Sequence, residues 1–238
     1  MRGVDLLRSH QIDFHVIAVV TKDSLDHADG IFDFFVGNGI ARFGFNIEEQ
    51  EGIHTRSTLD SGSNDKVAAF FRTMFERQKA AGGAVRIREF DFALQRILCR
   101  RESASEEFVY ENEQVRPFGI LSVDWQGNYS TFSPEMLGVS TPEYGPFSFG
   151  SFLEGGLEGA LTNKNFLSVL EDTKAGVERC RRECSFFNLC GGGAPANKYF
   201  ENGSFDSTET AYCRHVLQLP ISIVLEDLEQ ALPVAVTA

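Results

Sequence analysis

Four cysteines toward the C-terminal end of the chain have the residue type and spacing to bind a metal. Gaps of three and five residues separate the first three, and a fourth follows a glycine-rich stretch: Cys180, Cys184, Cys190 and Cys213. Thiolates are soft ligands that suit tetrahedral Zn²⁺ or an iron–sulfur cluster. Spacing alone favours structural zinc over a cluster. The competing interpretation is four scattered reduced cysteines, or disulfides.

The N-terminal segment bears on the redox state of these thiols. Asp5 and Arg8 interrupt any apolar run in residues 1–8, so we expect no signal peptide, and no stretch reaches the length of a membrane span. We therefore expect a cytoplasmic protein with reduced thiols, which favours metal binding over disulfides. The fifth cysteine, Cys99, lies in a segment with apolar residues at helical spacing and is interpreted as a packing residue.

The charge of the chain excludes two classes of partner. The 238 residues carry a formal net charge of −12 at pH 7. Nucleic acid and anionic membrane surfaces would be repelled by such a chain, so we expect neither as a partner. The length allows one large domain or two modest ones.

The first eighty residues alternate between strand and helix patterns. Helices are expected at 3–9, 25–36 and 67–81, and strands at 14–20 and 42–47. This order calls for a parallel sheet with right-handed crossovers. Two strands do not make a stable parallel sheet, so part of the sheet or barrel is expected to come from elsewhere. A complementary chain, a split gene or a truncated gene model would each explain that.

The pattern changes at about Pro117, which suggests domains at 1–116 and 117–238. Alternation around a turn predicts a hairpin at 120–132. A helix carrying Phe166 follows, and Gly176 is expected to end it. A last helix is expected between Pro220 and Pro233.

Three segments resemble radical SAM enzymes with a C-terminal SPASM domain. They are 43–52, 131–138 and, with the most specific motif, 190–213. Within that group the chain is most similar to maturases of glycine-rich-repeat peptides, which install cyclophane-type crosslinks. The resemblance implies an α/β fold: the second part of an incomplete radical SAM (β/α) barrel, then a small SPASM-type Fe–S domain with a β-hairpin and helices.

The resemblance also implies one auxiliary [4Fe–4S] cluster. The four cysteines match the ligands of the distal auxiliary cluster, with one extra residue between Cys180 and Cys184. Other residues occupy the positions of the proximal cluster's cysteines: Phe118, Phe132 or Ser133, and Ala194. The Cys-x3-Cys-x2-Cys motif that holds the SAM-cleaving cluster is absent from the sequence. We therefore expect S-adenosylmethionine and a second [4Fe–4S] cluster only in the complete enzyme, and no SAM cleavage by this chain alone.

Polar residues end the second predicted strand, where parallel sheets collect ligands and catalysis. Asn46 is a candidate for binding S-adenosylmethionine or the substrate backbone. Glu48 could do the same, or act as a base after radical formation. The alternative is that Glu48, Glu49 and Glu51 form a solvated acidic loop.

Three functions remain open on the sequence. The leading one is the C-terminal portion of a radical SAM/SPASM enzyme that crosslinks a ribosomally made precursor peptide, completed by a partner chain or segment. The second is a non-catalytic peptide-binding or scaffold protein derived from such an enzyme. The third is a structural zinc protein with four cysteine ligands.

Overall fold

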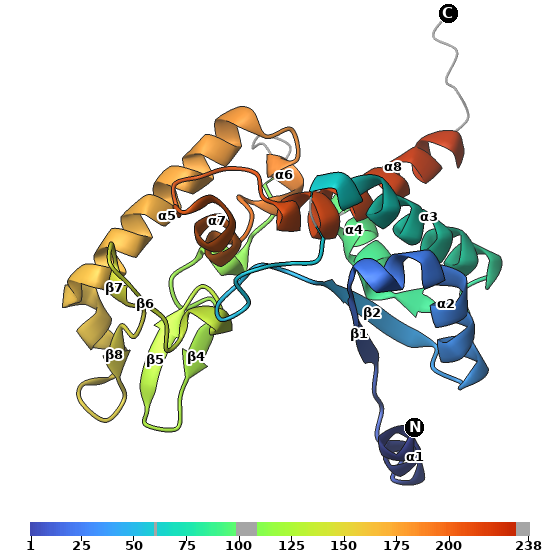
Figure 1. Ribbon diagram of the computed structural model, residues 1–238, viewed down its shortest axis with the longest axis horizontal. Helices are drawn as coiled ribbons and strands as arrows, with labels where there is room; N and C mark the ends of the chain where they lie inside the picture. The colour runs from blue at the N-terminus through green and yellow to red at the C-terminus, as the bar shows by residue number, and fades with distance from the viewer. Residues whose placement is uncertain (60, 99–108, 232–238) are drawn as a thin grey trace, which may run out of the picture. The chain divides into compact units, whose positions relative to one another are not determined.

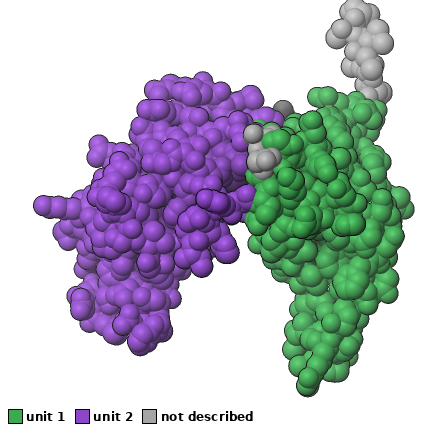
Figure 2. All heavy atoms as spheres, in the orientation of Figure 1, with its two compact units in different colours: residues 1–48, 58–99, 215–238 green, residues 49–57, 100–214 purple. Residues whose placement is uncertain are grey.

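The computed structural model describes residues 1–59, 61–98 and 109–231. The chain divides into two compact units, coloured separately in Figure 2. Unit 1 contains 1–48, 58–99 and 215–238, and unit 2 contains 49–57 and 100–214. This division differs from the predicted 1–116 and 117–238, because the last helix packs with helices of the first half of the chain. Cys99 lies outside the described residues.

Unit 1 is built on a three-stranded parallel sheet in the order β1–β2–β3. Figure 1 shows β1 and β2 side by side. The strands are β1 (Val16–Val20), β2 (Arg42–Ile47) and β3 (Arg86–Ile87). Ala18 of β1 is paired with Phe45 of β2 in parallel register. The two predicted strands and their parallel pairing are confirmed. With two residues, β3 is too short to produce a period that the sequence could reveal.

The rest of unit 1 is mainly helical. Its helices are α1 (Arg2–Ser9), η1 (Lys22–His27), α2 (Ala28–Gly37), η2 (Ser61–Ser63), α3 (Asn64–Ala80), α4 (Arg88–Leu98) and α8 (Leu219–Ala231). The core contains edge-to-face phenylalanine rings, with Phe45 of β2 5.1 Å from Phe70 of α3 between ring centroids. Helix α8 packs against α3 and α4, and Arg72 pairs with Glu226 at 2.6 Å. That packing places the C-terminal helix in unit 1.

One part of the sheet in unit 1 carries exposed apolar side chains. Ile17 and Val19, on the same face of β1, are 45% and 64% exposed. Among the described residues β1 is an edge strand of the sheet. Parallel sheets in globular proteins are normally covered on both faces, so this face of β1 lacks the layer that usually covers such a strand.

Unit 2 consists of small antiparallel sheets and helices. Strands β4 (Leu121–Val123), β5 (Asn128–Thr131) and β8 (Gly150–Ser151) form one sheet, and β6 (Ser140–Thr141) pairs with β7 (Gly145–Pro146). The helices are η3 (Glu113–Val115), η4 (Pro134–Met136), η5 (Gly156–Thr162), α5 (Lys164–Glu183), α6 (Phe187–Cys190) and α7 (Pro195–Asn202), and the π-helical η6 (Cys213–Gln218) begins at the unit's end. The hairpin predicted at 120–132 is confirmed as β4–β5.

Helix α5 is longer than the sequence predicted. Gly176 was expected to end it, yet the helix continues to Glu183 with Gly176 in its interior. A Cβ at Gly176 would collide with the carbonyl oxygen of Phe205 and lie 3.1 Å from that of Ser207. The glycine therefore serves close packing against residues 205–207 rather than helix termination. The prediction was wrong because the sequence does not show that approach.

We predict that Gly176→Ala destabilises the protein while a second helical glycine tolerates the same change. Overpacking against the Phe205 carbonyl should cost about 1–3 kcal/mol of unfolding free energy. A Cβ on Gly30 in α2 would have no atom within 4 Å, so Gly30→Ala should gain about 0.5–1 kcal/mol. Urea unfolding followed by circular dichroism measures both. A Gly176→Ala protein as stable as wild type would contradict the packing described here.

Candidate metal centre

The four predicted ligand cysteines lie on the helices that end unit 2. Cys180 is in the last turn of α5, and Cys184 is the residue that caps it. Cys190 ends the single turn α6, and Cys213 begins η6. All four thiols are free; three are buried and Cys184 is partly exposed. The disulfide interpretation therefore finds no support in the structure.

A glycine turn connects the cysteine helices to α7. Gly191, Gly192 and Gly193 have φ values of 68°, 111° and 73°, a left-handed region that other residues rarely adopt. A Cβ at Gly191 would collide with the Tyr110 carbonyl oxygen. The Gly192 N–H donates to Cys190 Sγ at 3.4 Å. The turn thus brings a backbone donor onto a sulfur atom, an interaction by which proteins tune metal–thiolate centres.

A buried lysine contacts one of the thiols. Lys198 of α7 is 1% exposed, and its Nζ donates to Cys180 Sγ at 3.2 Å. The Cys180 thiol also faces the Gly192 carbonyl oxygen at 3.8 Å. On the other side of the group, Thr210 Oγ1 donates to Cys213 Sγ at 3.3 Å.

The thiols influence each other electrostatically. Burial, reinforced by Cys190 and Cys180, raises the pKa of Cys213 to about 11. Burial and the same two neighbours also raise the pKa of Cys184. Cys180 and Cys190 are therefore close enough to both Cys184 and Cys213 to influence the charge of those two thiols.

The residues present fit a soft metal centre by their chemistry. The group offers four sulfur donors, a type of ligand set that suits zinc or iron–sulfur clusters and not magnesium or calcium. Within residues 1–59, 61–98 and 109–231, no three His, Cys, Asp or Glu side chains stand in an arrangement ready to hold a metal ion. The assignment of the four cysteines as ligands stays a prediction.

The positions that the resemblance assigns to a second auxiliary cluster are filled by core packing. Phe132 is fully buried, and Ala194 is 2% exposed. The ring of Phe118 stacks on that of Phe166, with centroids 5.4 Å apart. Phe149 packs on Phe166 from another direction, also at 5.4 Å. Aromatic rings therefore occupy space around two of the positions where ligand sulfurs would be needed.

Asn46 and Glu48 lie at the carboxyl end of β2, as predicted, and each has a partner within unit 1. Arg88 donates to Asn46 Oδ1 at 3.0 Å. The backbone N–H of Thr58 donates to Glu48 Oε2 at 2.6 Å, and the Thr58 hydroxyl donates to the same oxygen. Their roles toward S-adenosylmethionine or substrate remain predictions.

A cluster of carboxyl side chains in unit 2 was not predicted from the sequence. Glu49 and Glu51 are partly buried instead of forming a solvated loop. The Ser133 hydroxyl lies 2.7 Å from Glu51 Oε1 and 2.6 Å from Glu135 Oε2. A hydroxyl donates one hydrogen, so one of these two contacts needs a protonated carboxyl group as donor. Asn197 donates to Glu49 Oε2 at 2.7 Å.

Burial changes the titration of two carboxyl side chains in this cluster. Desolvation, with the nearby charges of Glu135 and Glu49, raises the pKa of Glu51 to about 8. Desolvation also raises the pKa of Glu49. The run of acidic residues at 48–51 was the available signal, but it is equally typical of a solvated loop.

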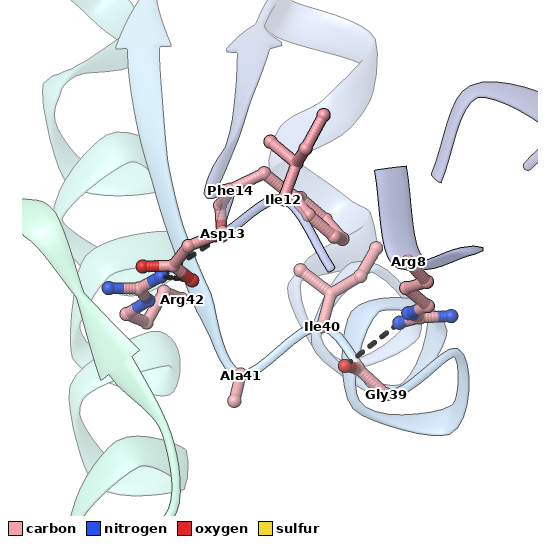
Figure 3. A pocket seen from close by; sticks show the side chains of 8 residues that line it. All are labelled: Arg8, Ile12, Asp13, Phe14, Gly39, Ile40, Ala41 and Arg42. Carbon is pink, nitrogen blue, oxygen red and sulfur yellow. Dashed lines mark hydrogen bonds and ion pairs between the residues drawn. The ribbon is translucent and has the colours of Figure 1, made fainter. Parts of the chain in front are cut away.

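A pocket in unit 1 lies at the amino ends of β1 and β2 (Figure 3). It has a volume of about 190 Å³ and is lined by Arg8, by residues 12–14 before β1 and by residues 39–42 leading into β2. Arg8 donates to the Gly39 carbonyl oxygen at 3.0 Å (Figure 3). Ligands of parallel sheets bind at the carboxyl ends of strands, whereas this pocket lies at their amino ends. We assign it a structural role.

Comparison with known proteins gives a fold and a relative. No protein-family model matches the chain. An uncharacterized protein of Synechocystis sp., sll1766, is 40% identical over 236 residues, which cover 99% of this chain and 58% of that protein. The chain thus spans somewhat more than half the length of this curated relative.

Solved structures of anSMEcpe, a radical SAM/SPASM enzyme, share the fold over 97% of the chain. The histidine-tagged form with bound AdoMet has a TM-score of 0.67 at 17% identity, and the chain covers 57% of it. The native form with AdoMet and the Kp18Cys peptide has a TM-score of 0.64 at 18% identity, and the chain covers 60% of it. The chain has an α/β fold that matches part of this enzyme.

The length and polarity of the helices bear on membrane insertion. Within the part of the chain that the structure describes, no helix combines the length and the apolar character needed to cross a bilayer.

We predict that Glu51→Gln changes how stability depends on pH. The folded protein keeps the Glu51 proton up to about pH 8, whereas an unfolded glutamate releases it near pH 4.5. Between these values the folded state binds more protons, so the unfolding free energy of wild type falls as pH rises. Glutamine mimics the protonated form, so the variant should lose less stability across this window. Thermal unfolding from pH 5 to pH 8 should show a Tm difference of a few degrees that grows with pH.

The control is Glu154→Gln, which neutralises an exposed carboxylate of the same unit. Its Tm should follow wild type at every pH. Parallel Tm curves for wild type and Glu51→Gln would show that Glu51 is not held protonated in the folded protein.

Proposed function

We propose that the chain is the C-terminal portion of a radical SAM/SPASM enzyme that crosslinks a ribosomally made precursor peptide and binds one auxiliary [4Fe–4S] cluster. The observation that carries the proposal is the group of four free thiols, gathered with a buried lysine at a glycine turn. It occurs in a chain with the fold of anSMEcpe.

The substrate and cofactor follow from the fold neighbours and the resemblance together. The anSMEcpe structures hold AdoMet, and two of them also hold a peptide. Radical SAM enzymes share that cofactor, and the maturases that this chain resembles act on peptides. We therefore assign S-adenosylmethionine and a precursor peptide to the complete enzyme.

The uncovered face of the sheet supports a completing segment or partner. Ile17 and Val19 are exposed on β1, whereas a parallel strand of a barrel is covered on both faces. Some two fifths of the Synechocystis relative has no counterpart in this chain, which leaves room for the rest of a barrel. In our proposal that part carries the SAM-cleaving cluster.

The chain's own residues have distinct roles in this proposal. Cys180, Cys184, Cys190 and Cys213 would hold the auxiliary cluster, which supplies electron transfer or support for the peptide site. The Gly192 N–H would stabilise negative charge on sulfur. Asn46 would position S-adenosylmethionine or the peptide backbone, and Glu48 would accept a proton late in the reaction.

One cluster is proposed, not two. The packing around Phe118 and Phe132 leaves unit 2 with an aromatic core at the proximal position. Cysteine ligands would be required there, and phenylalanine offers no metal ligand.

Two alternatives from the sequence remain. The Cys-x3-Cys knuckle is typical of structural zinc sites. A non-catalytic peptide-binding or scaffold protein derived from such an enzyme is the other alternative, and the crosslinking experiment below separates it from the enzyme.

We predict that protein purified without air is coloured and contains about four iron and four sulfide atoms per chain. Visible absorption and iron and sulfide analysis measure this directly. Cys213→Ser should lose most of the iron, whereas Gly30→Ala, far from any cysteine in the sequence, should keep it. A colourless protein with one zinc ion per chain would establish the zinc alternative instead.

The activity is tested by restoring the proposed missing part. We expect peptide crosslinking when the chain is co-expressed with a segment that carries the Cys-x3-Cys-x2-Cys motif and with a glycine-rich precursor peptide. Each crosslink removes one hydrogen pair, which mass spectrometry of the peptide detects. Glu48→Gln should reduce the yield at least tenfold if Glu48 is the base. An unchanged peptide mass with wild type would favour the scaffold alternative.

A further inference from the structure

We propose that Lys198 is a positioning residue for the auxiliary cluster: its Nζ donates a hydrogen bond to the Cys180 sulfur and would raise the reduction potential of a cluster bound there. The inference rests on the proposed function, since it needs an iron–sulfur cluster at the four cysteines.

The first argument is where the lysine side chain runs. Its Cε lies 3.6 Å from the position of a Cβ on Gly193, and that position is 3.2 Å from Cys213 Sγ. Its Nζ lies 3.2 Å from Cys180 Sγ. Lys198 therefore runs past Gly193, beside the segment that holds Cys213, and ends on the Cys180 sulfur of α5.

The second argument is burial. Lysine is almost never fully buried without a partner for its charge, because desolvation of an ammonium group is costly. Lys198 is 1% exposed. Among the described residues its hydrogen bond goes to a thiol, and no acidic side chain forms an ion pair with it. A neutral thiol is a weak acceptor, so the site lacks the negative charge that would stabilise the ammonium.

Four thiolates around a cluster would supply that charge. A [4Fe–4S]²⁺ core with four thiolates carries a net charge of −2, which becomes more negative on reduction. An N–H donor and a positive charge beside the sulfur atoms stabilise the more negative, reduced state. Lys198 should therefore raise the potential, and its removal should lower it.

The arrangement also explains two glycines. The position of a Cβ on Gly176 lies 3.2 Å from Lys198 Nζ, and that on Gly193 crowds Cys213 Sγ. Side chains at either position would fill the space through which the lysine reaches the sulfur atoms.

The test compares Lys198→Met with Lys198→Arg in the full chain, reconstituted anaerobically with iron and sulfide. Methionine keeps the length and removes the charge, whereas arginine keeps a cationic donor. Lys174→Met is the matched control, because Lys174 is an exposed lysine on α5. The measurement is the midpoint potential from a reductive titration followed by electron paramagnetic resonance.

We expect Lys198→Met to disfavour cluster reduction at least tenfold, a shift of about 59 mV to lower potential for a one-electron couple. Lys198→Arg should restore most of this, and Lys174→Met should match wild type. Equal potentials in wild type and Lys198→Met, with normal iron content in both, would overturn the inference and leave the cluster proposal intact. A wild-type protein that holds zinc or no metal would overturn the cluster itself.

A second measurement does not depend on the folding of Lys198→Met. Wild-type protein labelled with ¹⁵N at the lysine side-chain nitrogens is reduced, and hyperfine coupling between the cluster and ¹⁵N is recorded by pulsed paramagnetic resonance. The coupling should be present in wild type and absent in Lys198→Arg, which keeps the positive charge but lacks the label. Its absence in wild-type protein that contains the reduced cluster would contradict the hydrogen bond.

Discussion

A buried lysine and a group of sulfur atoms share the interior of unit 2, and the contact between Lys198 Nζ and Cys180 Sγ joins them. A charged amine in a protein interior needs negative charge beside it, and thiolates need cations. Thiols ionised around a metal would therefore compensate the charge of the lysine. The surrounding structure brings the lysine and the sulfur atoms together. Helix α5 delivers Cys180, and the glycine turn after α6 brings α7 and its lysine back toward the same sulfur atoms.

Glycines that permit unusual backbone conformations or close packing lie beside the cysteines and Lys198. Gly191 to Gly193 adopt a left-handed conformation that side chains disfavour, and Gly176 allows the Phe205 segment to approach α5. In contrast, the core beneath the hairpin is filled by large rings around Phe166. One half of unit 2 is thus organised around sulfur and the other around aromatic packing. This contrast supports a single cluster, because phenylalanine at the proximal position provides volume but no ligand.

Burial has a different effect on the cluster of carboxyl side chains around Glu51. The short segment 49–57 leaves unit 1 in sequence and belongs to unit 2, where Glu49, Glu51 and Glu135 lie close to one another. Burial raises the pKa of both Glu49 and Glu51, and the Ser133 hydroxyl contacts both Glu51 and Glu135. A run of acidic residues that resembles a solvated loop becomes part of the packed structure of the unit.

The sequence by itself determined the elements whose signals are local. The apolar run at 14–20, the period of α3 and the hairpin turn are set by neighbouring residues, so strand, helix and turn were all predicted from them. The type and spacing of the four cysteines also defined the candidate metal centre. Only the tertiary structure decided the interior position of Gly176, the place of the last helix in unit 1, and the burial of Lys198 and Glu51. Those features depend on contacts between residues distant in sequence, and a glycine, lysine or glutamate has the same local pattern whether exposed or enclosed.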